Sequence, residues 1–208
     1  MPDREYILHR IRSGLGRHID QPAVPAPPPR LVASPIDLER RIQLLLANFP
    51  GESFRAGSPA EAGRQVELIV ADRSAIASAA AVLLDTGVTS LPGVRSGITD
   101  GAVLQDEAAN AEVGISSADY AVVDPGALVL LSSSHEDRLI SLLPSIHIAV
   151  VPSQAIVSGL DELFTVLPDP AEISSSMVLI AGPSRKGDIE MKLTLGVHGP
   201  REIYLVIV

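Results

Sequence analysis

The sequence predicts an α/β fold with a mixed, largely parallel sheet flanked by helices, and three observations lead to it. First, helix-like and strand-like segments alternate along the 208 residues. Second, short apolar runs rich in β-branched residues, such as 146–151 and 202–208, are typical of strands buried on both faces of a parallel sheet. Third, the turn sequence Asp124-Pro125-Gly126 separates two apolar runs, which indicates an antiparallel hairpin near residues 112–131.

The N-terminal segment is expected to be a helical arm followed by a spacer. Ile7, Ile11 and Leu15 recur at i, i+4 and i+8, which predicts a helix over residues 4–18. The proline cluster after it cannot continue a helix and favours an extended spacer. The apolar stripe of the arm packs either on its own domain or on another subunit, and the second alternative would make the protein a homo-oligomer. The predicted division is an N-terminal helical arm at 1–20, a proline-rich linker at 21–33 and an α/β domain at 34–208.

Capping residues mark two further helix starts. Ser34 followed by Pro35 predicts the N-cap and first residue of a helix whose apolar face reaches Phe49. Ser58, with Glu61 three residues later, forms a capping box. The segment after this box fits either a helix or a strand.

The remaining elements are predicted from periodicity and from turn residues. They are an alanine-rich helix at 74–86 ended by Gly87, a strand at 88–91, a short helix at 105–110, strands at 112–115, 120–123 and 128–131, a helical turn at 138–143, a strand at 146–151 and a helix at 159–167.

The segment 177–208 predicts a strand, a glycine-rich basic loop, a short helix and a final strand. The final strand is apolar on both faces, which predicts an interior position in the sheet. The loop would lie outside the carboxyl end of a strand, where open α/β sheets bind ligands. Free backbone N–H groups before a helix, together with Arg185 and Lys186, would then bind a small anion. A plain turn with two solvated basic side chains explains the same residues.

The spacing of Gly182 and Gly187 invites comparison with a phosphate-binding loop. That loop needs Lys and then Ser or Thr after the second glycine, whereas Asp188 and Ile189 follow here. A nucleoside triphosphate site is therefore disfavoured. The predicted anion contacts are Gly182, Ser184, Arg185, Lys186 and Gly187, with His198 in the return turn nearby.

Several motifs together resemble the LUD-domain lactate-utilisation family, in its LutC/YkgG-like branch. The resemblance covers residues 95–208 well and the N-terminal half weakly. The motifs are Gly182-Pro183-Ser184-Arg185, Asp188-Ile189-Glu190, Leu195-Gly196-Val197-His198-Gly199-Pro200, Leu142-Leu143-Pro144 with His147-Ile148-Ala149-Val150-Val151, and, more loosely, Gly114-Ile115-Ser116 leading to Gly126.

The resemblance implies a NagB/RpiA/CoA-transferase-like fold and a role in oxidising L-lactate to pyruvate beside partner proteins that carry iron–sulfur clusters. Arg138 matches a position that is often basic in the family, so it joins the predicted anion contacts. The turn beginning at Asp124 departs from the family's Glu-Thr-Gly-Thr, because this chain has Asp-Pro-Gly-Ala there. Both hydroxyls of the family's turn are thus missing here, and the carboxylate is shorter.

Candidates for catalysis are weak. Asp124 follows a strand but also fits a turn-capping role. Glu190 lies in an otherwise apolar stretch, and His198 is flanked by glycine on its far side. His147 alternates within a buried strand and is interpreted as a hydrogen-bonded core histidine. No histidine pair has metal-ligand spacing, and neither a Gly-x-Ser-x-Gly elbow nor a dinucleotide fingerprint is present.

Composition narrows the function classes. The formal net charge of −9 argues against nucleic acid as the main partner. The absence of cysteine excludes disulfides, cysteine nucleophiles and cysteine-ligated iron–sulfur clusters in this chain. No apolar run reaches the ~18 residues that a membrane span needs, and Met1–Glu5 lacks a signal-peptide pattern. A cytoplasmic protein without its own cofactor or metal is expected.

The preferred function is a non-redox subunit or accessory protein of an L-lactate oxidation system that binds a small carboxylate or phosphate. Iron–sulfur clusters would then lie on partner proteins. Two alternatives stay open: a free-standing enzyme acting on a sugar phosphate or acyl-CoA, and a purely structural assembly subunit. The ligand's identity does not follow from the sequence.

Overall fold

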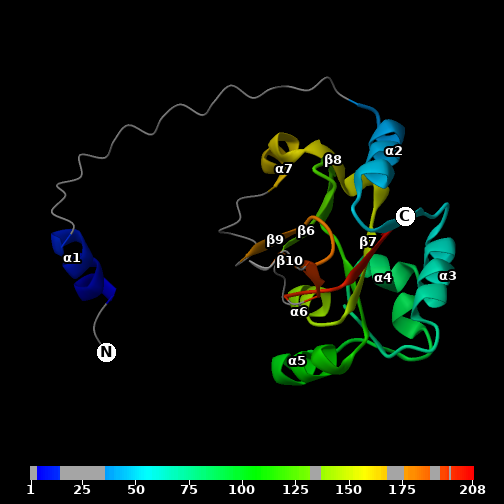
Figure 1. Cartoon of the computed structure of the whole chain (residues 1–208), viewed down its shortest axis with the longest axis horizontal. Helices are drawn as coiled ribbons and strands as arrows, with labels where there is room; N and C mark the ends of the chain where they lie inside the picture. The colour runs from blue at the N-terminus through cyan, green and yellow to red at the C-terminus, as the bar shows by residue number, and fades with distance from the viewer. Residues whose placement is uncertain (1–3, 15–35, 132–136, 168–175, 188–192, 197) are drawn as a thin grey trace. The chain divides into compact units, whose positions relative to one another are not determined.

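The computed structural model describes residues 4–14, 36–131, 137–167, 176–187, 193–196 and 198–208 (Figure 1). The chain divides into two compact units, Met1–Ala33 and Ser34–Val208. In the first unit, helix α1 runs from Arg4 to Gly14, where the apolar periodicity predicts a helix. The rest of that predicted helix and the proline-rich linker lie outside the described residues.

A six-stranded sheet forms the centre of the second unit, and all its neighbouring strands are parallel. The predicted α/β class is therefore confirmed. β12 lies between β1 and β7, which confirms the interior position predicted for the final strand. In spatial order the strands are β1 (Glu52–Arg55), β12 (Glu202–Ile207), β7 (Ile146–Val151), β4 (Val113–Ser117), β2 (Ala75–Ala77) and β3 (Val94–Arg95).

A second, mixed sheet contains the predicted antiparallel hairpin, which is formed by β5 and β6. At its turn the Asp124–Pro125 peptide bond is cis, and Gly126 has φ +79°. A Cβ on Gly126 would lie 2.6 Å from the carbonyl oxygen of Asn48, so this close approach requires glycine. The strands, in order, are β8 (Ile156–Gly159), β5 (Tyr120–Asp124), β6 (Ala127–Leu131) and β9 (Met177–Ile180).

The helices of the second unit start where capping residues allow it. The predicted capping box at the start of α3 is present: the Ser58 hydroxyl accepts from Glu61 N–H, and the Glu61 carboxylate accepts from a backbone N–H in return. That N–H belongs to Gly57, one residue before the Ser58 N–H that a capping box normally uses. The helices are α2 (Leu38–Asn48), α3 (Pro59–Val70), α4 (Ala81–Asp85), α5 (Gly101–Asn110), α6 (Asp137–Leu142) and α7 (Leu160–Val166), with 3₁₀ turns η1 (Val88–Ser90) and η2 (Ser153–Ala155). None of the helices in these described ranges is long and apolar enough to cross a membrane.

The core consists of apolar layers on the two faces of the parallel sheet. On one face, α3 and α4 pack over alternating residues such as Ile148 and Val150 of β7. On the other face, Ala149 and Val151 of the same strand pack against α2 and the second sheet. The outer face of the second sheet is covered by Leu163 of α7. The alternation along β7 therefore assigns each side chain to one of two apolar layers.

Three predictions in the first half of the second unit are wrong. Residues 75–77 form strand β2 rather than part of a long alanine-rich helix, and only Ala81–Asp85 is helical. Complete burial of 75–77 outweighs the helix propensity of alanine. Residues 88–90 form a 3₁₀ turn, and the strand follows at 94–95. The N-cap of α2 is Asp37 instead of Ser34, because the Asp37 carboxylate accepts from Arg40 N–H.

The predicted strand–loop–helix–strand unit is also wrong. β9 belongs to the second sheet, antiparallel to β6 at its edge, and Leu179 is 40% exposed. β10 (Arg185–Gly187) pairs with β11 (Leu193–Leu195) as a two-stranded antiparallel ribbon, so residues 193–195 are not helical. Local sequence could not show this, because the pairing of a strand depends on its partner strand and not on its own residues alone.

Candidate functional site

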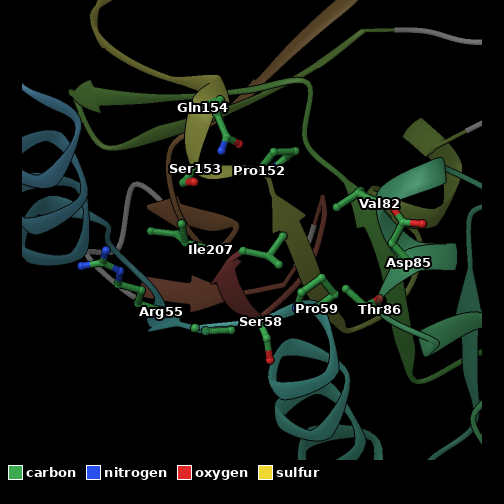
Figure 2. A pocket seen from close by; sticks show the side chains of 13 residues that line it. Arg55, Ser58, Pro59, Val82, Asp85, Thr86, Pro152, Ser153, Gln154 and Ile207 are labelled. Atoms are coloured by element: carbon green, nitrogen blue, oxygen red, sulfur yellow. The ribbon is translucent and has the colours of Figure 1, made fainter.

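A cavity of about 630 Å³ opens at the carboxyl ends of β1, β12 and β7, and we call it the carboxyl-end cavity (Figure 2). Ligands of open parallel sheets bind at this end, so the position itself marks a candidate site. The lining residues are Arg55, Ala56, Gly57, Ser58, Pro59, Val82, Asp85, Thr86, Pro152, Ser153, Gln154, Ile207 and Val208.

The wall formed by the start of α3 is held by its cap. The chain leaves β1 at Arg55 and reaches the N-cap Ser58 within three residues. The Ser58 Oγ accepts from Glu61 N–H at 3.3 Å, and Glu61 Oε2 accepts from Gly57 N–H at 2.8 Å. The N-terminal end of α3 therefore borders the cavity with a fixed geometry, and the helix dipole places partial positive charge there.

The opposite wall comes from the end of α4. Thr86 is 7% exposed and its hydroxyl donates to the Leu83 carbonyl at 2.9 Å. A Cβ added to Gly63 of α3 would lie 2.2 Å from the Thr86 carbonyl oxygen. α3 therefore contacts this wall backbone to backbone, and Gly63 is required for that approach.

The charges around the carboxyl-end cavity are nearly balanced. Arg55 turns away from the middle of the cavity in Figure 2 and forms an ion pair with Glu39 at 2.7 Å. Their hydrogen bond raises the pKa of Arg55 and lowers that of Glu39. Asp85 lies at the other side, and the amide of Gln154 points into the space. The described side chains of the lining thus offer one cation, one carboxylate and neutral hydrogen-bonding groups around apolar residues.

A second cavity of about 440 Å³ lies before the first residues of β7 and β12, and we call it the amino-end cavity. Because the strands are parallel, this is the other end of the same sheet. Its lining residues are Leu142, Leu143, Pro144, Ser145, Gly196, His198, Gly199 and Arg201.

Part of the predicted anion site is adjacent to the amino-end cavity. The Ser184 Oγ accepts from His198 N–H at 3.3 Å, and Ser184 N–H donates to the Pro200 carbonyl at 2.8 Å. The structure therefore brings Ser184 and His198 together. Arg201 lines the same cavity but is not among the residues that the sequence predicts for the site. The sequence feature that could have indicated it is its position between Gly199-Pro200 and the final strand.

The other predicted site residues are more dispersed. Gly182 has φ +111° beside Pro50, and Arg185 is exposed on β10, where Lys186 and Gly187 follow it. Arg138 on α6 is exposed and donates to the Ser176 hydroxyl at 3.1 Å. Neither arginine lines the carboxyl-end or the amino-end cavity.

Of the two predicted catalytic carboxylates, Asp124 lines neither cavity. Asp124 is exposed at the end of β5. Glu190 and Asp188 lie outside the described residues. Within the described ranges, no group of three His, Asp or Glu side chains is arranged to hold a metal ion. The absence of a cofactor on this chain stays a prediction.

His147 is a hydrogen-bonded core histidine, as interpreted from the sequence. It is fully buried, and its Nε2 lies 2.9 Å from the Ser116 hydroxyl. Its Nδ1 has no hydrogen-bond partner in the described part of the chain. Burial lowers the pKa of His147 to about 4, so the ring is neutral at pH 7.

These features define an α/β protein with a parallel sheet and a ligand-sized cavity at the carboxyl ends of its strands. More specifically, residues 45–208 match the model of the LUD domain family, and the chain belongs to that family. The predicted family resemblance is confirmed.

Curated relatives and a solved structure agree with this assignment. Proteins named Lactate utilization protein C from Halalkalibacterium halodurans and Geobacillus kaustophilus are 39% and 36% identical over 114 and 107 residues. These matches cover 52% and 50% of this chain but 50% and 45% of the relatives, so the chain spans about half the length of the curated relatives it matches. The crystal structure of a DUF162 family protein from Deinococcus radiodurans has the same fold, with a TM-score of 0.61 at 18% identity over 84% of this chain and 99% of that one.

Proposed function

We propose that this chain is a non-redox subunit or accessory protein of a system that oxidises L-lactate to pyruvate, and that it binds a small anionic ligand in the carboxyl-end cavity. The observation that carries the lactate assignment is the 34–39% identity to proteins named Lactate utilization protein C. Because the sequence has no cysteine, cysteine-ligated iron–sulfur clusters would lie on cytoplasmic partner proteins.

The lining of the carboxyl-end cavity suits a 2-hydroxy or 2-keto acid. The positive end of α3 and the guanidinium of Arg55 attract a carboxylate. Arg55 and Glu39 are about half exposed, and exposed ion pairs contribute little, so a ligand carboxylate can compete with Glu39. Gln154 and Asp85 supply an amide and an acceptor for the ligand's hydroxyl or carbonyl group.

The test is calorimetric titration of the full chain with L-lactate and with pyruvate. We expect Arg55→Gln to weaken binding about tenfold, because a charged hydrogen bond is lost. Arg64→Gln is the matched control, since it removes an exposed arginine of α3 that does not line the cavity. The ligand assignment is wrong if neither acid binds, or if both variants change affinity equally.

The lactate assignment itself needs a second measurement. We expect the tagged chain to co-purify with iron–sulfur proteins from cells grown on lactate. Absence of such proteins under conditions that support lactate oxidation would contradict the subunit role without bearing on ligand binding.

A free-standing enzyme acting on a sugar phosphate or acyl-CoA remains the second candidate, because the carboxyl-end cavity is far larger than a three-carbon acid requires. In that case Asp85 is the carboxylate of the lining that could act as a base. Turnover by the purified chain that is abolished in Asp85→Asn would favour the enzyme.

A further inference from the structure

We propose that the amino-end cavity is a separate binding site for a phosphoryl group, either free phosphate or a phosphate monoester. This site goes beyond the proposed lactate-related function and does not depend on it. The described residues that line the amino-end cavity include two basic side chains, Arg201 and His198, and no Asp or Glu. Such a lining is notable in a chain with 25 acidic residues against 16 Lys and Arg.

Arg201 is held in place by its aliphatic stem. A Cβ on Gly196 would lie 2.1 Å from Arg201 Cγ and 3.3 Å from Nε, so the arginine side chain lies directly over this glycine. Gly196 also has φ +76°, which favours glycine. The Arg201 N–H donates to the Ser145 carbonyl at 2.8 Å, which fixes the backbone at the cavity wall. The stem of Arg201 therefore packs against the backbone of Gly196.

The guanidinium of Arg201 has no carboxylate partner among the described residues. Within the described part of the chain it forms no ion pair or side-chain hydrogen bond. Two acidic residues at this end of the sheet have other hydrogen-bond partners: Glu112 accepts from Ser74 N–H at 3.4 Å, and Glu202 accepts from the Tyr204 hydroxyl at 3.0 Å. As far as the described residues go, the charge of Arg201 is thus left for a ligand.

His198 is placed by the same turn. Its N–H donates to Ser184 Oγ at 3.3 Å, while the carbonyl of Ser184 accepts from Gly196 N–H at 2.9 Å. These two bonds tie the turn that carries His198 to the segment at Ser184. The imidazole and the guanidinium therefore come from one turn and line one cavity.

The chemistry of these groups selects the ligand class. A guanidinium presents parallel N–H donors that match two oxygens of a phosphoryl group, and an imidazole adds a third donor. Two basic groups without a carboxylate suit a dianion better than a monocarboxylate. The volume of about 440 Å³ leaves room for an ester substituent beyond the phosphate.

The test is calorimetric titration of the full chain with inorganic phosphate and with glycerol phosphate, and acetate serves as the monoanion control. We expect one phosphate per chain, with affinity lowered about tenfold or more in Arg201→Gln and by a smaller factor in His198→Gln. Glutamine retains part of the stem over Gly196, so the fold is preserved, which thermal melting verifies. Tighter binding of glycerol phosphate than of phosphate identifies an ester as the ligand, and the reverse identifies free phosphate.

Two controls separate this site from general charge and from the lactate proposal. Arg64→Gln removes the same charge at another exposed position and should leave phosphate affinity unchanged. Arg55→Gln, in the carboxyl-end cavity, should also leave it unchanged. The proposal is overturned if the wild-type chain binds neither phosphate compound, or if Arg201→Gln binds phosphate as tightly as Arg64→Gln does.

Discussion

The two ends of the parallel sheet differ in how they arrange charge. At the carboxyl ends of the strands, Arg55 is paired with Glu39 and Asp85 lies at the opposite wall. At the amino ends, Arg201 and His198 line one cavity, and none of its other described lining residues is Asp or Glu. The carboxyl-end position follows the general rule for ligand sites in parallel sheets. The amino-end position does not, and its case rests on local charge and packing. Position and charge are therefore separate indicators of a site, and here they point to different ends.

The largest expected effect concerns His147, on the strand that reaches both cavities. Because its pKa falls from 6.5 to about 4 on folding, the unfolded chain takes up a proton first as pH drops. His147 should therefore cost about 3 kcal/mol of stability between pH 6.5 and pH 4, and none above pH 6.5. Denaturant unfolding of wild type and His147→Gln across this range measures the difference, and parallel curves would contradict it. The result distinguishes unfolding of the chain at low pH from a loss of ligand binding at low pH in either cavity.

A smaller loss of stability, confined to the carboxyl end, is expected from Gly63→Ala. Alanine normally stabilises a helix more than glycine does. At position 63, however, the alanine Cβ would lie 2.2 Å from the Thr86 carbonyl oxygen. We expect destabilisation by about 2 kcal/mol and weaker lactate binding, with unchanged phosphate binding. Gly101→Ala is the matched control, because nothing lies within 4 Å of its Cβ. Equal melting temperatures of the two variants would show that α3 does not hold this wall.

Gln154→Ala should affect binding more than folding. Its amide points into the carboxyl-end cavity, so its loss should weaken lactate binding by about 1 kcal/mol, as for one neutral hydrogen bond. Titration with lactate and phosphate measures both ends in one protein. A loss of phosphate affinity in this variant would link the two cavities.

The smallest expected effect comes from Glu39→Gln. The hydrogen bond to Arg55 that lowers the pKa of Glu39 also occupies the guanidinium. Removing the carboxylate should leave the melting temperature unchanged and raise lactate affinity about twofold, because Arg55 loses a competitor. Lower affinity in this variant would mean that Glu39 itself contributes to the site.

The sequence predicted elements whose signals are local or strongly periodic. β7, β12 and the hairpin around Asp124 follow from apolar runs and a turn, and the cap at Ser58 follows from spacing. The prediction of a helix over β2 is wrong because alanine has a low strand propensity and a high helix propensity. The burial of β2, which decides its structure, depends on residues distant in the sequence.

The site was harder to predict because its walls come from distant segments. The carboxyl-end cavity combines residues near 55–59, 82–86, 152–154 and 207–208, and no motif connects them. Ser184 and His198 were predicted near each other from the turn glycines, and they do share a hydrogen bond. The sequence does not indicate Arg201, because its significance depends on packing over Gly196 and on the hydrogen-bond partners of Glu112 and Glu202.

The central claim, that the two ends of the sheet bind different ligands independently, is tested most directly by titrating L-lactate into the full chain with and without saturating phosphate. Two separate sites predict the same lactate affinity in both titrations, apart from a small effect of ionic strength. A third titration, in sodium chloride at the same ionic strength as the phosphate, measures that effect. An apparent lactate affinity that falls in proportion to the phosphate concentration would mean that both anions compete for one site, and it would contradict the account.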